Sequence, residues 1–152
     1  MTRKTASPRR PSTGCTCLRL RKAARGVSTI FDQYLQRAGL TVTQYGLLGH
    51  LKSFDGIGIG ELADKLIMDP TTLTRNLRPL QRQGLVVLAP DPRDRRSRCL
   101  HLTARGRAAF DRAVPEWMRA QRHIEKTLGV ANAAALNAAL DRMLDLLAKP
   151  GG

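Results

Sequence analysis

The sequence predicts a mainly α-helical fold with one small β-hairpin. Apolar residues recur at the three- and four-residue spacing of a helix through several segments of the 152-residue chain. Two short β-prone runs, residues 85–88 and 99–102, flank the arginine-rich turn "DPRDRRSR" and predict the hairpin. This length suits one domain with a real core and is too short for two ordinary domains.

The amino-terminal part predicts two helices separated by a glycine. An apolar stripe begins at Leu20 and ends before Gly39, which closes the first helix. Thr41 and Gln44 have the spacing of a capping box, in which each side chain bonds the backbone N–H of the other residue. A second helix is therefore expected from this box to about Phe54.

Glycines in "DGIGIG", residues 55–60, interrupt the second helix. Residues 57–59 could add a very short strand after this break. Ile59, Leu62 and Leu66 then recur at helical spacing and predict a third helix.

Asp69 and Pro70 have the residue types of an N-cap and a first helical position, and they predict the start of a fourth helix. Gly84 should close this helix, and Pro79, which lacks an N–H, should bend its last turn. The apolar residues fall on one edge of the fourth helix. The opposite, outward face carries no acid and consists of Thr71, Thr72, Thr74, Arg75 and Arg78.

The carboxy-terminal part predicts two further helices. Thr103 should cap a long helix over 104–128, with a kink at Pro115, and a last helix should cover 132–148. Together with the first helix, these helices have more apolar surface than a small single domain needs. Two-fold pairing of two chains would bury the surplus, whereas a monomer with a thin core is the alternative.

The positive charge is concentrated in two blocks. Lys and Arg outnumber Asp and Glu by 26 to 12. Residues 1–25 hold eight Lys/Arg and no acid, and residues 69–107 hold nine arginines against three acids. Evenly spread charge would indicate a role in solubility, whereas charge gathered in blocks indicates a face that contacts a polyanion.

The predicted order of elements is that of a winged helix-turn-helix domain. Such a domain places a recognition helix in a DNA major groove, about 12 Å wide, and a cation on the hairpin tip can reach the minor groove. Small hydroxyls near a helix N-terminus suit phosphate groups, and Arg75 is long enough to reach a guanine edge. The alternative for "DPRDRRSR" is a solvated turn whose charged residues balance one another.

The segment "ELADKLIMDPTTLTRNLRPLQRQGLV", followed by "DPRDRRSRCLHLTARG", resembles the DNA-binding half of the MarR family of bacterial winged-helix regulators. The resemblance extends over residues 17–147 and includes "LTVTQYGLL". It implies a homodimer that reads a pseudo-palindromic double-stranded DNA site. The dimerisation helices would lie at 17–38 and 104–148 and the winged helix-turn-helix domain at 41–103, after a basic, flexible tail at 1–16.

By position, the resemblance makes Arg96 the wing-tip arginine and Asp94 the residue that orients it. The other wing arginines, Arg93, Arg95 and Arg98, would meet phosphates. The resemblance also implies a transcription regulator, usually a repressor, that a small-molecule effector or the oxidation of a thiol releases from DNA. An effector would lodge among the first, second and fifth helices.

Three cysteines are an odd number and predict reduced thiols rather than a disulfide framework. Cys17 falls where peroxide-sensing members of the family carry their reactive cysteine, and Cys15 is a possible disulfide partner. Those members activate the thiol with tyrosines, whereas this chain has Phe31 and Val42 at the corresponding positions. The alternative is that Cys17 packs at the dimer interface as a small apolar residue.

The sequence favours neither a membrane protein nor an enzyme. It has no apolar run long enough for a membrane span and no signal peptide, so a soluble, cytoplasmic protein is expected. Phosphate loops, nucleophile elbows and His-Glu zinc motifs are missing. Cys15 and Cys17 could begin a metal site with one of the three histidines, but no second close pair of ligands follows, so neither a metal nor another cofactor is expected.

Two other functions remain open at this point. One is a winged-helix interaction module that binds protein or RNA, because an acidic partner could also satisfy the cationic face. The other is a basic protein that coats nucleic acid with little preference for sequence.

Overall fold

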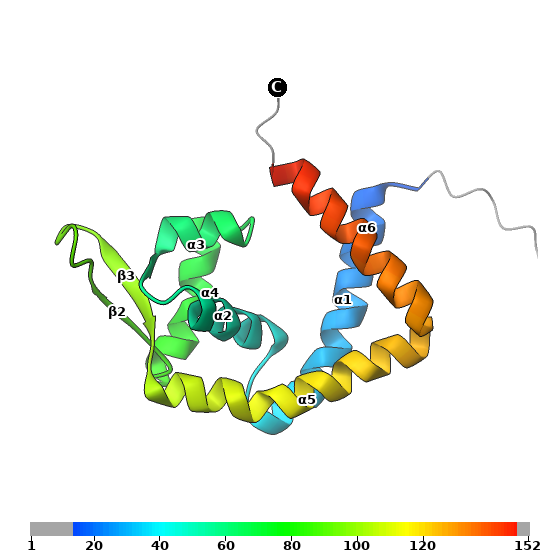
Figure 1. Ribbon diagram of the computed structural model, residues 1–152, viewed down its shortest axis with the longest axis horizontal. Coiled ribbons are helices and arrows are strands. Elements are labelled where there is room, and N and C mark those ends of the chain that lie inside the picture. The colour runs from blue at the N-terminus through cyan, green and yellow to red at the C-terminus, as the bar shows by residue number, and fades with distance from the viewer. Residues whose placement is uncertain (1–13, 149–152) are drawn as a thin grey trace, which may run out of the picture.

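The computed structural model describes residues 14–148, so most of the expected tail lies outside it. The predicted mainly helical fold with a small antiparallel sheet is confirmed (Figure 1). None of the helices within 14–148 is long and apolar enough to cross a membrane. In chain order the elements are α1 Thr16–Leu35, a 3-10 helix η1 Gln36–Ala38, α2 Val42–Ser53, β1 Ile57–Gly58, α3 Ile59–Lys65, α4 Pro70–Arg82, β2 Val86–Pro90, β3 Arg98–Leu102, α5 Ala104–Leu128 and α6 Val130–Ala148.

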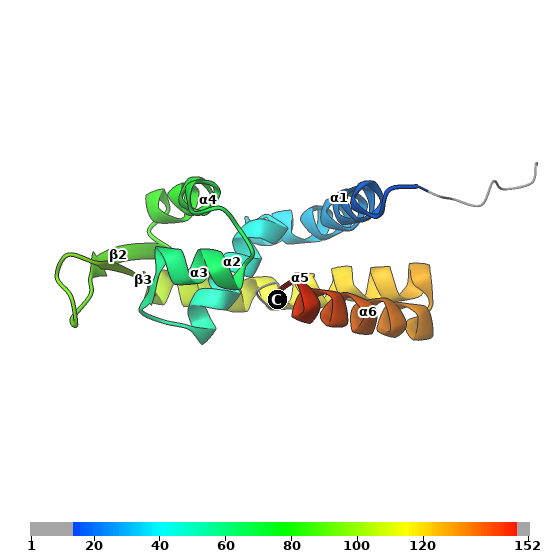
Figure 2. The same cartoon turned by 90° about the horizontal axis from the view of Figure 1, so that it is seen from above.

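The elements gather towards the two ends of an elongated molecule. Helices α2, α3 and α4 surround the root of the hairpin at one end, and the hairpin projects beyond them (Figure 1). Helices α1 and α6 lie towards the other end (Figure 2). Helix α5 runs between the two ends and contacts both α1 and α2.

The predicted helix starts of α2 and α4 are confirmed in atomic detail. The Gln44 N–H donates to Thr41 Oγ1 over 3.2 Å, and the Thr41 N–H donates to Gln44 Oε1 over 3.0 Å. Gly39, before this box, has a φ of 75°, which favours glycine. At α4, the Asp69 carboxylate accepts the Thr72 N–H over 2.9 Å, as an N-cap should.

Helices α1 and α6 begin earlier than the sequence predicts. Helix α1 begins at Thr16 rather than near Leu20, and α6 begins at Val130. Helix α4 passes through Pro79 and ends at Arg82, close to the predicted end at Gly84. The Pro79 carbonyl still accepts the Gln83 N–H over 3.1 Å, which closes the last turn.

The hairpin strands also differ from the prediction. Strand β2 covers Val86–Pro90 instead of 85–88, and β3 begins at Arg98 instead of Cys99. The sheet order is β1-β3-β2, so β2 is an edge strand, where a proline removes no hydrogen bond of the sheet. Pro90 pairs with Arg98, which leaves residues 91–97 as the turn.

Leucines from several elements form the core beneath α4. The leucines with less than 2% of their surface exposed come from α1, α2, α3, α4 and β3, and they belong to one continuous cluster of buried residues. This cluster anchors the inner face of α4 and leaves its outer face free. These leucines are Leu35, Leu48, Leu51, Leu62, Leu73, Leu77, Leu80 and Leu100.

A close backbone contact joins the start of α5 to the start of the hairpin. The Thr103 hydroxyl donates to the Gly84 carbonyl over 2.7 Å and accepts the Gly106 N–H over 2.9 Å. The Thr103 N–H donates to the Leu85 carbonyl over 3.1 Å. A Cβ atom added at Gly106 would lie 2.1 Å from that same carbonyl oxygen. Position 106 therefore has no room for a side chain, and only glycine fits there.

We expect Gly106→Ala to lower the free energy of unfolding by about 1–3 kcal/mol, because a backbone oxygen cannot move aside as a flexible side chain can. Denaturant unfolding at a fixed protein concentration measures this loss. Gly60→Ala is the matched control, since a Cβ there meets nothing within 4 Å. It should change stability by no more than about 0.5 kcal/mol, and equal losses in both variants would contradict the steric explanation.

Candidate nucleic-acid interface

Helix α4 presents the predicted outward face to solvent. Leu73, Leu77 and Leu80 are buried against the core, and the opposite side of α4 is free of acidic residues. Thr71, Arg75 and Arg78 are exposed, while Thr72 and Thr74 are half-buried.

The three threonine hydroxyls of this face are not equivalent. Thr72 Oγ1 donates to the Asp69 carboxylate over 3.2 Å, and Thr74 Oγ1 donates to the Pro70 carbonyl over 2.9 Å. Both hydrogens are thus used within the helix. The Thr71 hydroxyl has no such partner within residues 14–148 and can donate to a ligand.

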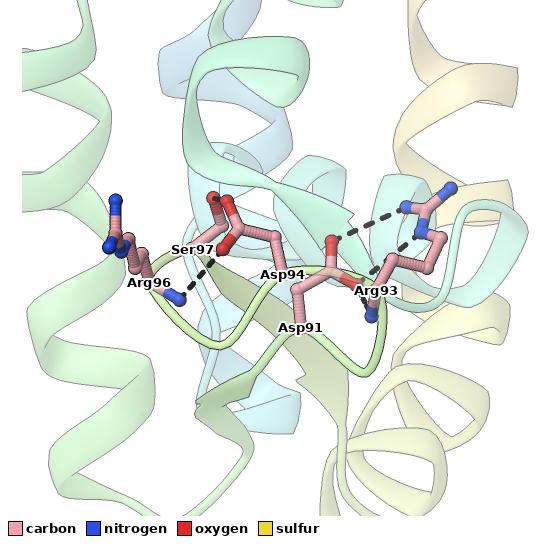
Figure 3. Close-up of polar contacts among 5 residues, drawn as sticks. All are labelled: Asp91, Arg93, Asp94, Arg96 and Ser97. Carbon is pink, nitrogen blue, oxygen red and sulfur yellow. Dashed lines mark hydrogen bonds and ion pairs between the residues drawn. The ribbon is translucent and has the colours of Figure 1, made fainter.

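Two aspartates hold the backbone of the wing turn in a fixed shape (Figure 3). The Asp91 carboxylate accepts the Arg93 N–H over 2.8 Å, and the Asp94 carboxylate accepts the Arg96 N–H over 3.0 Å. In each case an aspartate bonds the N–H two residues later, which is an Asx turn. The Asp91 N–H also donates to the Ser97 carbonyl over 2.9 Å and closes the turn.

Arg93 is partly committed to Asp91. Its guanidinium lies 3.4 Å from each carboxylate oxygen, and the two side chains lie on one side of the turn in Figure 3. The pKa of the Asp91 carboxyl lies below its ordinary value, first because it accepts the Arg93 N–H and second because it accepts from the guanidinium. This carboxylate therefore stays charged under ordinary conditions.

Asp94 contacts the main chain of Arg96, whereas the family resemblance predicts that it orients the Arg96 side chain. Its second oxygen accepts the Ser97 hydroxyl over 2.9 Å. The Arg96 guanidinium points away from Asp94 (Figure 3). In the described part of the chain, the guanidiniums of Arg95 and Arg96 have no ion pair, and that of Arg98 donates to the Leu88 carbonyl over 3.3 Å.

Sequence reasoning missed the structural roles of Asp91 and Ser97 in this turn. The spacing in "DPR" and "DRR" contains the signal, because aspartate commonly accepts the N–H two residues later. The arrangement leaves at least two guanidiniums free on a rigid turn. An anion with closely spaced charges, such as a nucleic-acid backbone, is the natural partner for such a turn.

The two amino-terminal cysteines are exposed, and neither has an activating tyrosine. Cys15 is the residue before α1, and Cys17 lies in its first turn. Of the two tyrosines in the chain, Tyr34 bonds His123, and Tyr45 stacks on aromatic rings of α5. Burial raises the pKa of the third thiol, Cys99, which lies in the sheet.

The histidines that could extend a metal site lie apart. His50 Nδ1 contacts the Gly46 carbonyl, and His101 lies 3.4 Å from Asp55. Over residues 14–148, no three potential metal ligands come together.

Comparison with known proteins connects this geometry to a family. The MarR family model matches residues 38–97. Over 129 residues the chain is 32% identical to the HTH-type transcriptional repressor NicR of Pseudomonas putida, an alignment that covers 83% of this chain and 80% of the repressor. It is also 32% identical over 96 residues to the transcriptional activatory protein BadR of Rhodopseudomonas palustris, which covers 61% of this chain and about half, 55%, of that protein.

A solved structure agrees with the sequence comparisons. The transcriptional regulator MosR of M. tuberculosis, crystallised in complex with DNA, superposes with a TM-score of 0.69 at 34% sequence identity. The superposition covers 86% of this chain and 98% of that one. The chain therefore belongs to the MarR family of winged helix-turn-helix transcription regulators.

Proposed function

We propose that this chain is a homodimeric regulator that binds a pseudo-palindromic double-stranded DNA site through α4 and the wing. The observation that carries the proposal is the acid-free outer face of α4 together with a wing turn whose acids hold its backbone and leave arginines free. Two such units related by two-fold symmetry would read half-sites about 34 Å apart. The chain would act by binding, without catalysis, in the cytoplasm.

Each cationic residue then has a role that follows from its position. Arg75 reaches a base edge in the major groove, and Arg96 enters the adjacent minor groove. The Thr71 hydroxyl donates to a phosphate at the start of α4. Arg93 would exchange Asp91 for a phosphate at little cost, since an exposed ion pair contributes only about 0–1 kcal/mol. Further phosphate contacts would come from Arg78, Arg95 and Arg98, and from Thr72 once its hydroxyl exchanges the Asp69 carboxylate for a phosphate.

Dimerisation would involve α1, α5 and α6, within 17–38 and 104–148. Large apolar side chains on α5 and α6 stand well exposed in the single chain, which is costly unless another surface covers them. A two-fold pairing of these helices would bury them and set the distance between the two α4 helices. They are Met118, Leu128, Val130, Leu136, Leu144, Leu146 and Leu147.

We further propose repression that is relieved by a small-molecule effector. The two α4 helices of such a dimer can stand at different distances from each other. An effector shifts the equilibrium between these conformations only if it binds one of them more tightly than the other. Thiol oxidation at Cys17 is the second candidate. It is less favoured because both tyrosines are engaged elsewhere.

Selection of bound sites from a random duplex library tests the proposed function. A palindrome with half-sites one helical turn apart is the expected result. Enrichment without a consensus would favour a protein that coats nucleic acid. The lack of any duplex binding would favour a module that binds protein or RNA.

Arg75→Ala should weaken binding to the selected site by about 1–3 kcal/mol and relax the preference at one position of each half-site, because it removes a base contact. Thr71→Ala is the matched comparison and should weaken binding to all sequences alike. Titrations on selected and random duplexes measure both effects. An equal loss on the two duplexes for Arg75→Ala would refute its role as a base contact.

Arg96→Ala should raise the dissociation constant about tenfold at moderate salt, and the slope of log affinity against log salt should become shallower by about one to two, one contact per wing. The melting temperature of the free protein should stay level or rise slightly as repulsion is relieved. Arg93→Ala, which removes an arginine already paired in the free protein, should have a smaller effect. If the affinity of Arg96→Ala for DNA equals that of the wild type at several salt concentrations, the wing does not contact DNA and is a solvated turn.

Peroxide at micromolar concentration should not release the wild-type protein from its site, because neither Cys15 nor Cys17 has a tyrosine hydroxyl to activate it. Cys17→Ser should bind DNA as the wild type does. Mobility shifts with and without peroxide provide the measurement. Release of the wild type, but not of Cys17→Ser, would make thiol oxidation the regulatory mechanism.

A further inference from the structure

A hollow of about 560 Å³ lies where α1 meets the carboxy-terminal half of α5. We name it the α1–α5 hollow. Its volume is within the range of small-molecule sites, about 300–1,000 Å³, and it is open to solvent, because the α5 residues that line it are exposed. The residues that line it are Tyr34, Arg119, Arg122, His123, Lys126 and Thr127.

The basic residues of the hollow form one stripe along α5. Arg119, Arg122, His123 and Lys126 follow the spacing i, i+3, i+4 and i+7, which places them on one face of a helix. Like charges at this spacing destabilise a helix by about 0.2–0.5 kcal/mol per pair. An anion bound between these side chains would replace their mutual repulsion with attraction to the anion.

Two acids lie near this stripe, and neither of them pairs with Arg122 or Lys126. Glu116 lies 3.1 Å from Arg119 and 3.6 Å from Arg37. Glu125 accepts a hydrogen bond from Gln121 over 3.0 Å. Over the described residues, Arg122 and Lys126 therefore have no acidic partner.

Tyr34 of α1 contacts His123 of this stripe. The Tyr34 hydroxyl lies 3.0 Å from His123 Nδ1, and the two rings meet edge to face. When this hydroxyl donates to Nδ1, the imidazole carries its hydrogen on Nε2, where it can donate to a ligand. Arg37 lies over the Tyr34 ring, 5.7 Å from its centre.

We propose that the α1–α5 hollow binds a small anion that carries at least two negative charges on phosphate or carboxylate groups. Arg122 and Lys126 would hold the charged oxygens, and His123 Nε2 would donate a further hydrogen bond. The ligand would lie on α5 beside Tyr34, the one lining residue that α1 contributes. Because α5 begins at the root of the wing, this anion is also the effector that changes DNA affinity, a second step that rests on the proposed function.

Calorimetry on the free protein tests the site without DNA. Pyrophosphate and citrate, titrated separately at constant ionic strength, represent the phosphate and carboxylate forms of the ligand. We expect one or both to bind, and Arg122→Gln with Lys126→Gln to weaken that binding at least tenfold. The control removes the same net charge from exposed positions outside the hollow through Arg112→Gln with Arg142→Gln, and it should bind as the wild type does.

The outcomes separate the site from a general effect of charge. Binding of one anion alone identifies its chemical group as the one recognised. Equal losses in the two double variants would mean that bulk charge attracts the anion, and this would overturn the proposal. No binding of either anion at millimolar concentration would overturn it as well.

A second measurement tests the regulatory step. The anion that binds should change the affinity of the wild type for its selected DNA site at least threefold and leave the Arg122→Gln, Lys126→Gln variant unaffected. Anion binding with no change in DNA affinity would overturn the effector role and leave the site itself standing. Failure of the protein to bind any duplex would be seen before anion is added, so it concerns the proposed function alone.

Discussion

The contact between Gly106 and the Leu85 carbonyl fixes the relation between the wing and the rest of the molecule. Thr103 bonds the backbone on both sides of this contact, so the end of β3 and the start of α5 turn at one rigid point. Helix α5 then extends from the wing towards α1 and α6. Because α5 is a continuous helix, a rotation of the wing relative to the core would also move the far end of α5. A flexible connection at Gly106 would let the wing rotate without moving α5.

The two aspartates of the wing turn hold its backbone in place, although the arginines around them repel one another. In Asp91 and in Asp94, one carboxylate oxygen accepts a hydrogen bond from a backbone N–H, and these bonds order the turn in the free protein. The wing arginines other than Arg93, which pairs with Asp91, are thereby held close together without an acidic partner among the described residues. An ordered turn loses less conformational entropy on binding than a flexible one, so more of the electrostatic attraction remains as affinity.

Local patterns in the sequence predict local structure well, and contacts between distant residues poorly. The capping residues Thr41 and Asp69 were identified correctly because a cap depends on residues three positions apart. The end of β2 at Pro90 is not predictable, because the sequence does not reveal that this residue lies on a sheet edge. Likewise, Tyr34 and His123 are 89 residues apart, and only the packing of α1 on α5 brings them together.

The position of Pro90 at the outer edge of the hairpin has a consequence for crowding. An open strand edge offers unpaired N–H and carbonyl groups to any neighbouring strand, which invites sheets of different molecules to join. Pro90 removes a donor from that edge, and the opposite edge, β1, is only two residues long. Pro90 and the shortness of β1 therefore lower the tendency of hairpins from different molecules to add to one another.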